Sequence, residues 1–228
     1  MESIKSKTLN EFKMNILKYK TSIKKSTMKK YFSYLKKLMP LYENLIWNKD
    51  YNKLVKMKNK IKNLMKKTNY DDLIRQTAIF YGVQIDKIGI INIAFYPIPY
   101  GNNIKAYRIK NLETIGILIS KKQNIIWLTS ATILHEISHT IYFKSKIVNK
   151  NFNFKNKKRK LLVIEGFATA IGAGWGYNRL TSKNSIYKQW YNNKDYDKVA
   201  KKIYPKLKIY LDNNRTIDSD LIKYIKKL

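Results

Sequence analysis

Two histidines four residues apart are the part of this sequence best suited to chemistry. His135 and His139 are the only histidines among the 228 residues, and Glu136 directly follows the first of them. On a helix, positions i and i+4 lie one turn apart on the same face, so both imidazoles can reach one ion while Glu136 projects beside them. This HExxH pattern predicts a zinc ion bound by His135 and His139, with Glu136 as the general base of a hydrolytic reaction.

A hydrolytic zinc site needs a third protein ligand and one open position for water. The chain has no cysteine and no further histidine, so the third ligand must be a carboxylate. Glu165 is the only acidic residue between positions 140 and 194, and it lies in a basic and apolar stretch where a buried carboxylate needs a cation. We therefore predict Glu165 as the third ligand. A salt bridge between Glu165 and Arg159 or Lys160 is the alternative.

Other polar residues are weaker candidates for the site. Three aspartates of the C-terminal part lie in lysine-rich segments typical of a surface: Asp195, Asp197 and Asp212. Hydrolysis of a peptide bond usually needs a second donor besides zinc for the developing oxyanion. We predict Tyr177, twelve residues beyond Glu165, as this catalytic donor, and Arg179 is its rival.

The elements that must position these residues follow from hydrophobic spacing. Residues 2–82 carry apolar side chains every three or four positions, which predicts helices with lysines on their outer faces. Short runs of β-branched and aromatic residues then predict four strands, at 88–96, 105–109, 114–120 and 124–129. Ser130 can cap the motif helix, through about residue 143, and a second helix over 161–171 is expected to end at three glycines that also permit close backbone approach: Gly172, Gly174 and Gly176. Residues 182–228 read as helical again.

HExxH followed by Glu165, Gly166 and Ala168 resembles the gluzincins, the peptidase MA-like zinc metallopeptidases in which two motif histidines and a glutamate on the next long helix hold zinc. The resemblance implies an α+β, zincin-like fold. A small, mostly antiparallel twisted sheet would pack on the HExxH helix, with helical N- and C-terminal extensions, and strand 114–120 would pair with an extended peptide substrate. Gluzincins often place an acidic residue four beyond the third ligand, where this chain has Thr169. The ImmA/IrrE metallopeptidases, which cleave a dedicated regulatory protein, are also similar.

Two regions are expected on this basis. Residues 1–84 form a helical, lysine-rich N-terminal region that packs on the catalytic part, and residues 85–228 form the zincin-like metallopeptidase domain. The expected partners are a protein or peptide substrate. Nothing in the sequence resembles a signal peptide or a transmembrane segment, so a cytoplasmic location is the default expectation, with a virion component as the alternative.

The charge is extreme, with 47 Lys and Arg against 15 Asp and Glu and a formal net charge of +32. Such a field attracts nucleic acid or another polyanion without sequence preference. Abundant Lys, Asn, Ile and Tyr are also what A- and T-rich codons encode, so part of the charge can reflect genome composition. A non-enzymatic, basic nucleic-acid-binding or packaging protein is therefore the competing hypothesis.

Overall fold

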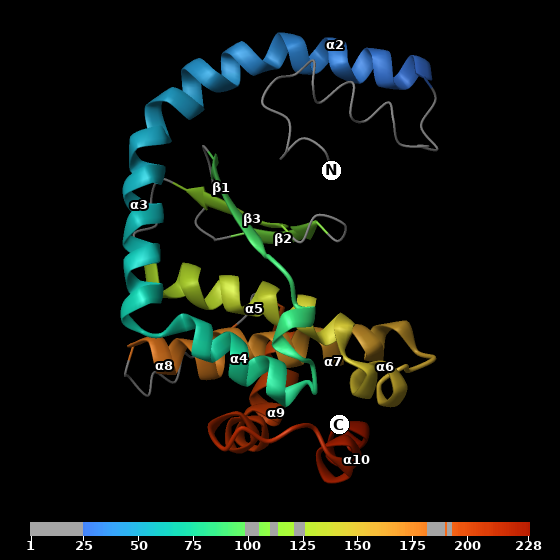
Figure 1. Ribbon diagram of the computed structural model, residues 1–228. Coiled ribbons are helices and arrows are strands. Elements are labelled where there is room, and N and C mark those ends of the chain that lie inside the picture. The colour runs from blue at the N-terminus through green and yellow to red at the C-terminus, as the bar shows by residue number, and fades with distance from the viewer. Residues whose placement is uncertain (1–24, 99–104, 110–113, 121–125, 182–189, 191–192) are drawn as a thin grey trace.

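The computed structural model describes residues 25–98, 105–109, 114–120, 126–181, 190 and 193–228 (Figure 1). This part of the chain is mostly helical. Its N-terminal half contains α2 (Lys25–Tyr42), the π-helical turn η2 (Glu43–Trp47), α3 (Asn48–Lys67), α4 (Tyr70–Phe80) and the short η3 (Ile85–Lys87). After the strands come α5 (Ile126–Lys144), α6 (Lys146–Asn151), α7 (Lys157–Thr169), η4 (Ala170–Gly176), α8 (Tyr177–Thr181), α9 (Lys194–Asp212) and α10 (Ser219–Lys227).

The sheet has three strands in the order β1-β3-β2: β1 (Asn92–Ile98), β3 (Thr114–Ser120) and β2 (Lys105–Ile109). β1 pairs with β3 in parallel, with Asn92 opposite Thr114, whereas β2 pairs with β3 antiparallel, with Lys105 opposite Leu118. The expected α+β, zincin-like fold with a mostly antiparallel sheet and helical extensions is therefore wrong. The sheet is mixed and small, and helices make up most of the described chain.

Two further strand predictions need correction. Residues 126–129 are the first turn of α5 and not a fourth strand, while residues 124 and 125 lie outside the described part. A short apolar run fits a buried helix as well as a buried strand, and periodicity alone does not separate them. β3 is the central strand among the described ones, so its backbone pairs on both sides. It therefore cannot be the edge strand that was expected to bind a substrate.

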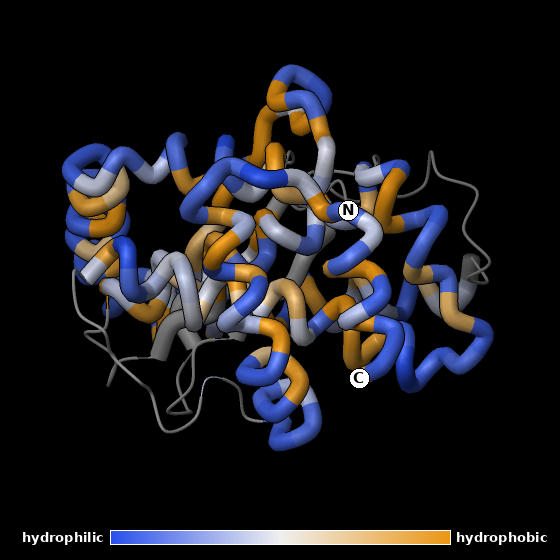
Figure 2. The backbone as a smooth tube through the Cα atoms, turned by 90° about the horizontal axis from the view of Figure 1, so that it is seen from below, coloured by the Kyte–Doolittle hydropathy of each residue, from blue (hydrophilic) through white to orange (hydrophobic). Residues whose placement is uncertain are grey.

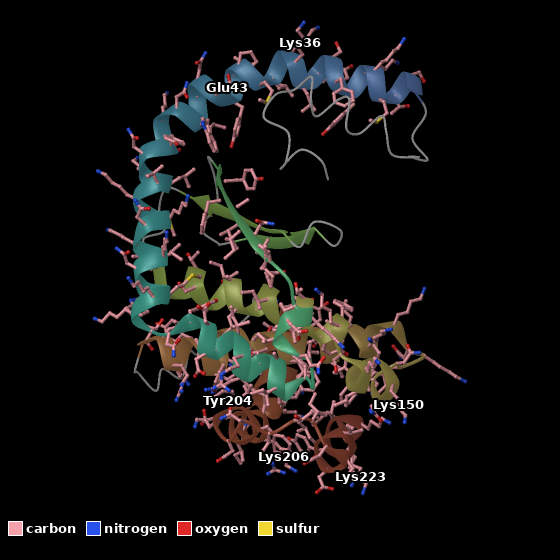
Figure 3. All side chains as sticks on the ribbon, in the orientation of Figure 1. Lys36, Glu43, Lys150, Tyr204, Lys206 and Lys223 are labelled. Carbon is pink, nitrogen blue, oxygen red and sulfur yellow. The ribbon has the colours of Figure 1, made fainter. Side chains whose placement is uncertain are left out.

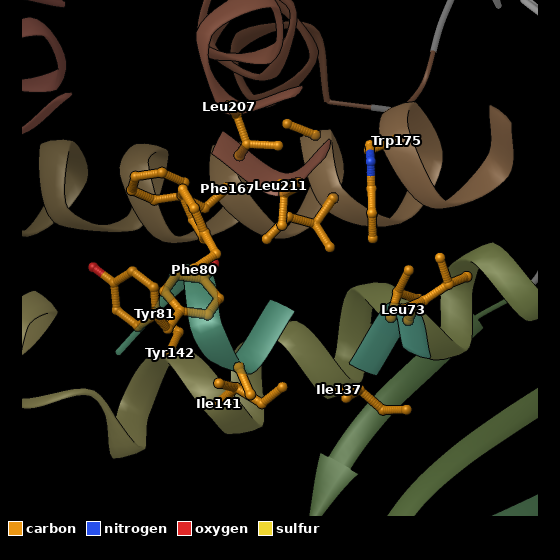
Figure 4. Packing of buried hydrophobic residues seen from close by; sticks show 14 of the residues in the cluster. Leu73, Phe80, Tyr81, Ile137, Ile141, Tyr142, Phe167, Trp175, Leu207 and Leu211 are labelled. Atoms are coloured by element: carbon orange, nitrogen blue, oxygen red, sulfur yellow. The ribbon is translucent and has the colours of Figure 1, made fainter. Parts of the chain in front are cut away.

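Helix α5 runs through the core of the molecule, with nearly all its middle residues buried. An aromatic cluster fills the space between α4, α5 and α7, and Figure 4 shows its rings converging: Phe80, Tyr81, Tyr142 and Phe167. Two buried hydrogen bonds join α4 and its end to α5. The Tyr70 hydroxyl donates to the Ser130 carbonyl at 2.6 Å, and the Tyr81 hydroxyl lies 3.1 Å from Ser138 Oγ. α5 is therefore fixed along its length.

The segment after α7 continues as a helix where a break was expected. All three glycines lie in the π-helical segment η4, and the chain continues from it directly into α8. The predicted close approach is confirmed at Gly172, because a Cβ atom there would lie 2.6 Å from the Ala131 carbonyl oxygen and 2.7 Å from His135 Cβ. η4 therefore packs directly behind the first motif histidine.

Helices α4 to α10 pack together into a helical body, and the N-terminal helices α2 and α3 extend away from it. In Figure 1, α3 runs beside the sheet and α2 crosses on the far side of the sheet from α5. α3 contacts β1, α4 and α5, and α4 supplies core side chains such as Leu73 and Phe80. The division of the chain at residue 84 stays a prediction. In Figure 2, hydrophobic and hydrophilic residues alternate along the helices, and no helix in the described ranges is long and apolar enough to span a bilayer.

Candidate metal centre

Three predicted ligands converge on one point between α5 and α7. His135 and His139 lie one turn apart on α5, and Glu165 comes from α7. The two Nε2 atoms are 3.1 Å apart, and a single carboxylate oxygen, Glu165 Oε2, lies 3.5 Å from each of them. In the described part of the chain, these residues form the one group of three or more His, Asp or Glu side chains close enough to hold an ion.

The size of this triangle can be compared with what a metal ion requires. Tetrahedral zinc with bonds of about 2.0–2.1 Å separates its ligand atoms by about 3.3–3.4 Å. The three observed distances, 3.1, 3.5 and 3.5 Å, lie on either side of that value. Neighbouring ligands of an octahedral ion with similar bonds would be about 3.0 Å apart, which two of the distances exceed by half an ångström. The donor atoms are therefore close enough together, and of suitable types, to hold one small metal ion with nitrogen and oxygen ligands.

Burial makes the group costly to leave without a cation. His135 and His139 are 7% and 8% exposed, and the Glu165 side chain is 17% exposed. Glu165 Oε2 and His139 Nδ1 are both buried without a hydrogen-bond partner among the described residues. A buried carboxylate oxygen that accepts no hydrogen bond is unfavourable, and a bound cation would lower that penalty.

The carboxyl group of Glu165 is in the ionised form that a ligand needs. Burial raises its pKa, but the interactions of the carboxylate with His135 and His139, whose Nε2 atoms lie 3.5 Å away, outweigh burial and lower the pKa to about 2. The alternative salt bridges do not form. Arg159 donates to the Lys226 carbonyl and Lys160 donates to Asn153. The histidines are therefore the basic partners that the described structure gives to Glu165.

The proposed general base lies beside this group. Glu136 is half-buried, in contrast to the buried histidines on either side of it in the motif. One residue along a helix turns the side chain by about 100°, so Glu136 projects next to the pair and not into the same point. This position suits a proton acceptor at the edge of a metal site. The role of Glu136 in catalysis stays a prediction.

The predicted oxyanion donors are placed differently from each other. Tyr177 is buried at the start of α8, and α8 packs against α5. Arg179 is exposed, with its guanidinium 6.0 Å from the Trp175 ring, and it lines a surface pocket with residues of the α3–α4 turn. None of the three converging residues lines that pocket. The role of Tyr177 as the oxyanion donor stays a prediction, with Arg179 as its rival.

The remaining acidic candidates are used elsewhere. Asp197 accepts hydrogen bonds from the backbone of Trp190 and from Lys201, both at 2.7 Å. Asp212 accepts from Trp175 Nε1 at 2.8 Å and pairs with Lys208. Asp197 is buried, so its assignment to the surface was wrong, but it is not part of the group. Asp195 is exposed near the start of α9.

Sequence reasoning missed the residues that support the ligands. Ser138 is fully buried between the motif histidines and contacts Tyr81, which anchors the motif helix. Gly166 lets α9 pack against α7 beside Glu165, since a Cβ atom there would lie 2.7 Å from Val199 Cγ1. A serine on an apolar helix face and a glycine inside a helix were the available signals. The residues that they contact, Tyr81 and Val199, are distant in sequence and could not be predicted from it.

Comparison of the chain with models of protein families, with curated proteins and with solved structures finds no match.

Proposed function

We propose that this protein is a zinc-dependent metallopeptidase that uses His135, His139 and Glu165 as zinc ligands. One observation carries the proposal: three donor atoms from an HExxH helix and a following helix converge at 3.1–3.5 Å, close to the separation of about 3.3–3.4 Å between ligands of tetrahedral zinc. With three protein ligands, the fourth position is left for water, as in catalytic zinc sites.

Each residue of the site would have a different role in the reaction. A zinc ion held by these ligands would supply a water molecule of lowered pKa and polarise the scissile carbonyl. Glu136 would accept the proton from that water and pass it to the leaving amine, while Glu165 would stay ionised as a ligand. Tyr177 donates a hydrogen bond to the oxyanion. The buried positions of His135 and His139 keep the imidazoles in place throughout.

The substrate is proposed to be a protein or peptide. A dedicated protease of the ImmA/IrrE kind would leave a generic peptide library largely uncut and still cleave its one partner. A general peptidase would cleave many members of the same library. Incubation of the zinc-loaded protein with such a library, followed by mass spectrometry, distinguishes these two forms of the proposal.

Metal content is the direct test of the site. Purified protein should contain one zinc ion per chain, and His139→Ala and Glu165→Ala should lower that content to near zero because each removes a ligand. Asp197→Asn, which alters a buried carboxylate outside the group, is the matched control and should retain zinc. An anomalous-scattering map at the zinc edge should place the ion between the three side chains.

The competing hypothesis is a basic nucleic-acid-binding or packaging protein. It is favoured by the net charge of +32. With 47 lysines and arginines against 15 acidic residues, most of the cationic side chains cannot be neutralised by ion pairs within the chain. If purified protein held no zinc and bound DNA with a steep salt dependence that His139→Ala did not change, the peptidase proposal would be refuted.

A further inference from the structure

Helix α2 and the η2 turn that continues it carry an exposed apolar stripe. Tyr34, Leu38, Leu41 and Leu45 recur every three or four residues and are 62%, 56%, 56% and 57% exposed. The opposite edge of the apolar face is covered, since Met28 and Phe32 are 6% and 7% exposed. Apart from η2, α2 makes no extensive contact with another described element. Contiguous exposed apolar residues of this kind mark an interaction surface.

The polar side of the same helix is strongly basic. α2 holds five lysines and no acidic residue. At about 100° per residue, Lys30 and Lys37 border the stripe on one side. The other side continues into the half-buried apolar residues Leu35 and Tyr42. A helix with a basic polar face and an exposed face of leucine and tyrosine fits the interface of an anionic lipid bilayer.

Other occupants fit these observations less well. A second copy of the chain would bring its own lysines and its +32 charge against the same surface, and like charges oppose pairing. A coiled-coil partner is matched by charged residues on both flanks of a seam, whereas the stripe here has lysines on one flank only. Nucleic acid explains the lysines but gives no reason for four exposed apolar side chains.

We propose that α2 and η2 together form a membrane-surface helix that inserts Tyr34, Leu38, Leu41 and Leu45 into an anionic bilayer while Lys30 and Lys37 bind lipid headgroups. Figure 1 shows α2 beyond the sheet, on the side away from the helical body that holds the candidate metal centre. A bilayer bound along α2 would therefore leave that body in the aqueous phase. The proposal does not depend on the presence of zinc or on peptidase activity.

Sedimentation of the full chain with lipid vesicles tests the proposal. The protein should bind vesicles of phosphatidylcholine with phosphatidylserine and bind phosphatidylcholine alone much more weakly. The triple variant Leu38→Ser, Leu41→Ser, Leu45→Ser should weaken binding at least about a hundredfold, because burial of each leucine is lost. The control triple variant Ile85→Ser, Leu161→Ser, Ile209→Ser removes three exposed apolar side chains outside α2 and should bind like the natural protein.

The lysines are tested separately. Lys30→Gln with Lys37→Gln should lower binding about 25-fold, since one lysine near an anionic surface is worth about a fivefold change. Lys206→Gln with Lys223→Gln makes the same charge change at the opposite end of the molecule, as Figure 3 shows, and should have a much smaller effect. Circular dichroism confirms that all variants remain folded.

Several results would overturn the proposal. One is that the folded natural protein does not bind anionic vesicles. Another is vesicle binding that the leucine variant keeps in full, because lysines alone would then explain it. A dimer in solution that the leucine variant dissociates would assign the stripe to a second copy. Binding to DNA that depends on the same leucines would assign the stripe to nucleic acid.

Discussion

The helical body and the α2 arm, which consists of α2 and η2, both carry apolar residues at helical spacing. These residues are buried in the body and exposed in the arm. In the body, Leu134 and Ile137 of α5 are buried, and hydrogen bonds join elements about sixty residues apart. In α2 and η2, Leu38 and Leu45 are more than half exposed. Leucines at helical spacing therefore predict an amphipathic helix, but they do not predict whether its apolar face lies in the core.

This difference matters because a catalytic site needs side chains that are held in place by a packed core. Three donor atoms within 3.5 Å of one another require helices whose relative positions are fixed by close packing. Gly172 and Gly166 provide such packing around α5 and α7. The α2 arm has no comparable contacts with the body, which suits a surface that engages a separate partner. Four experiments can sharpen or break this comparison.

Glu136→Gln should have the largest effect, and it should affect only chemistry. Loss of the general base is expected to lower peptide hydrolysis by about 10²- to 10⁴-fold, with the zinc content unchanged because the three ligands remain. Initial rates and metal analysis of the same sample measure both quantities. Thr132→Ala, at a half-buried position of the same helix, provides a control that retains the proposed base and all three ligands. Full turnover in Glu136→Gln would remove Glu136 from the mechanism.

The same change, Leu→Ala, should separate the two regions by stability. Leu134→Ala removes a fully buried side chain and should lower the free energy of unfolding by about 2–5 kcal/mol. Leu38→Ala removes an exposed side chain and should change that free energy by no more than about 0.5 kcal/mol. Urea denaturation measures both. Equal losses would mean that the α2 stripe is covered, which contradicts the comparison and the membrane proposal together.

Gly172→Ala should damage the body and the site at once. The new Cβ atom would lie 2.6 Å from the Ala131 carbonyl oxygen and 2.7 Å from His135 Cβ, so α5 and η4 must separate. We expect a loss of about 1–3 kcal/mol in the free energy of unfolding and weaker zinc binding. At Gly174 the nearest atoms are ring atoms of Tyr204 and Trp190, so Gly174→Ala should leave zinc affinity unchanged.

Acidification of the metal-free protein should have an effect that is confined to a narrow range of acidic pH. The pKa of Glu165 is lowered from 4.5 to about 2, so its carboxylate stabilises the fold above the unfolded-state value. That contribution is lost as the pH falls from about 4.5 through about 2. Glu165→Gln should therefore show less acid-induced destabilisation than the natural protein in this window, as measured by urea unfolding at several pH values. Equal acid responses would contradict the Glu165–histidine interaction.

Much of the site could be predicted and less of the fold. His135 and His139 were readable because helical spacing converts a difference of four positions into proximity. Glu165 was readable by elimination, because no other acid lies between positions 140 and 194. Strand direction was not readable, since alternation indicates a strand but not its neighbour, and β1 pairs with β3 in parallel past the intervening β2. The helical start of α5 was mistaken for a strand because a short apolar run fits either element.

The sequence by itself determined the donor types, their spacing on the motif helix and the excess of lysine, because these are properties of neighbouring residues and of composition. Only the tertiary structure decided that Glu165 meets both histidines, that Gly172 sits behind His135 and that the α2 leucines stay exposed. Each of these depends on how helices distant in sequence pack, and packing is set by the whole core and not by any one segment.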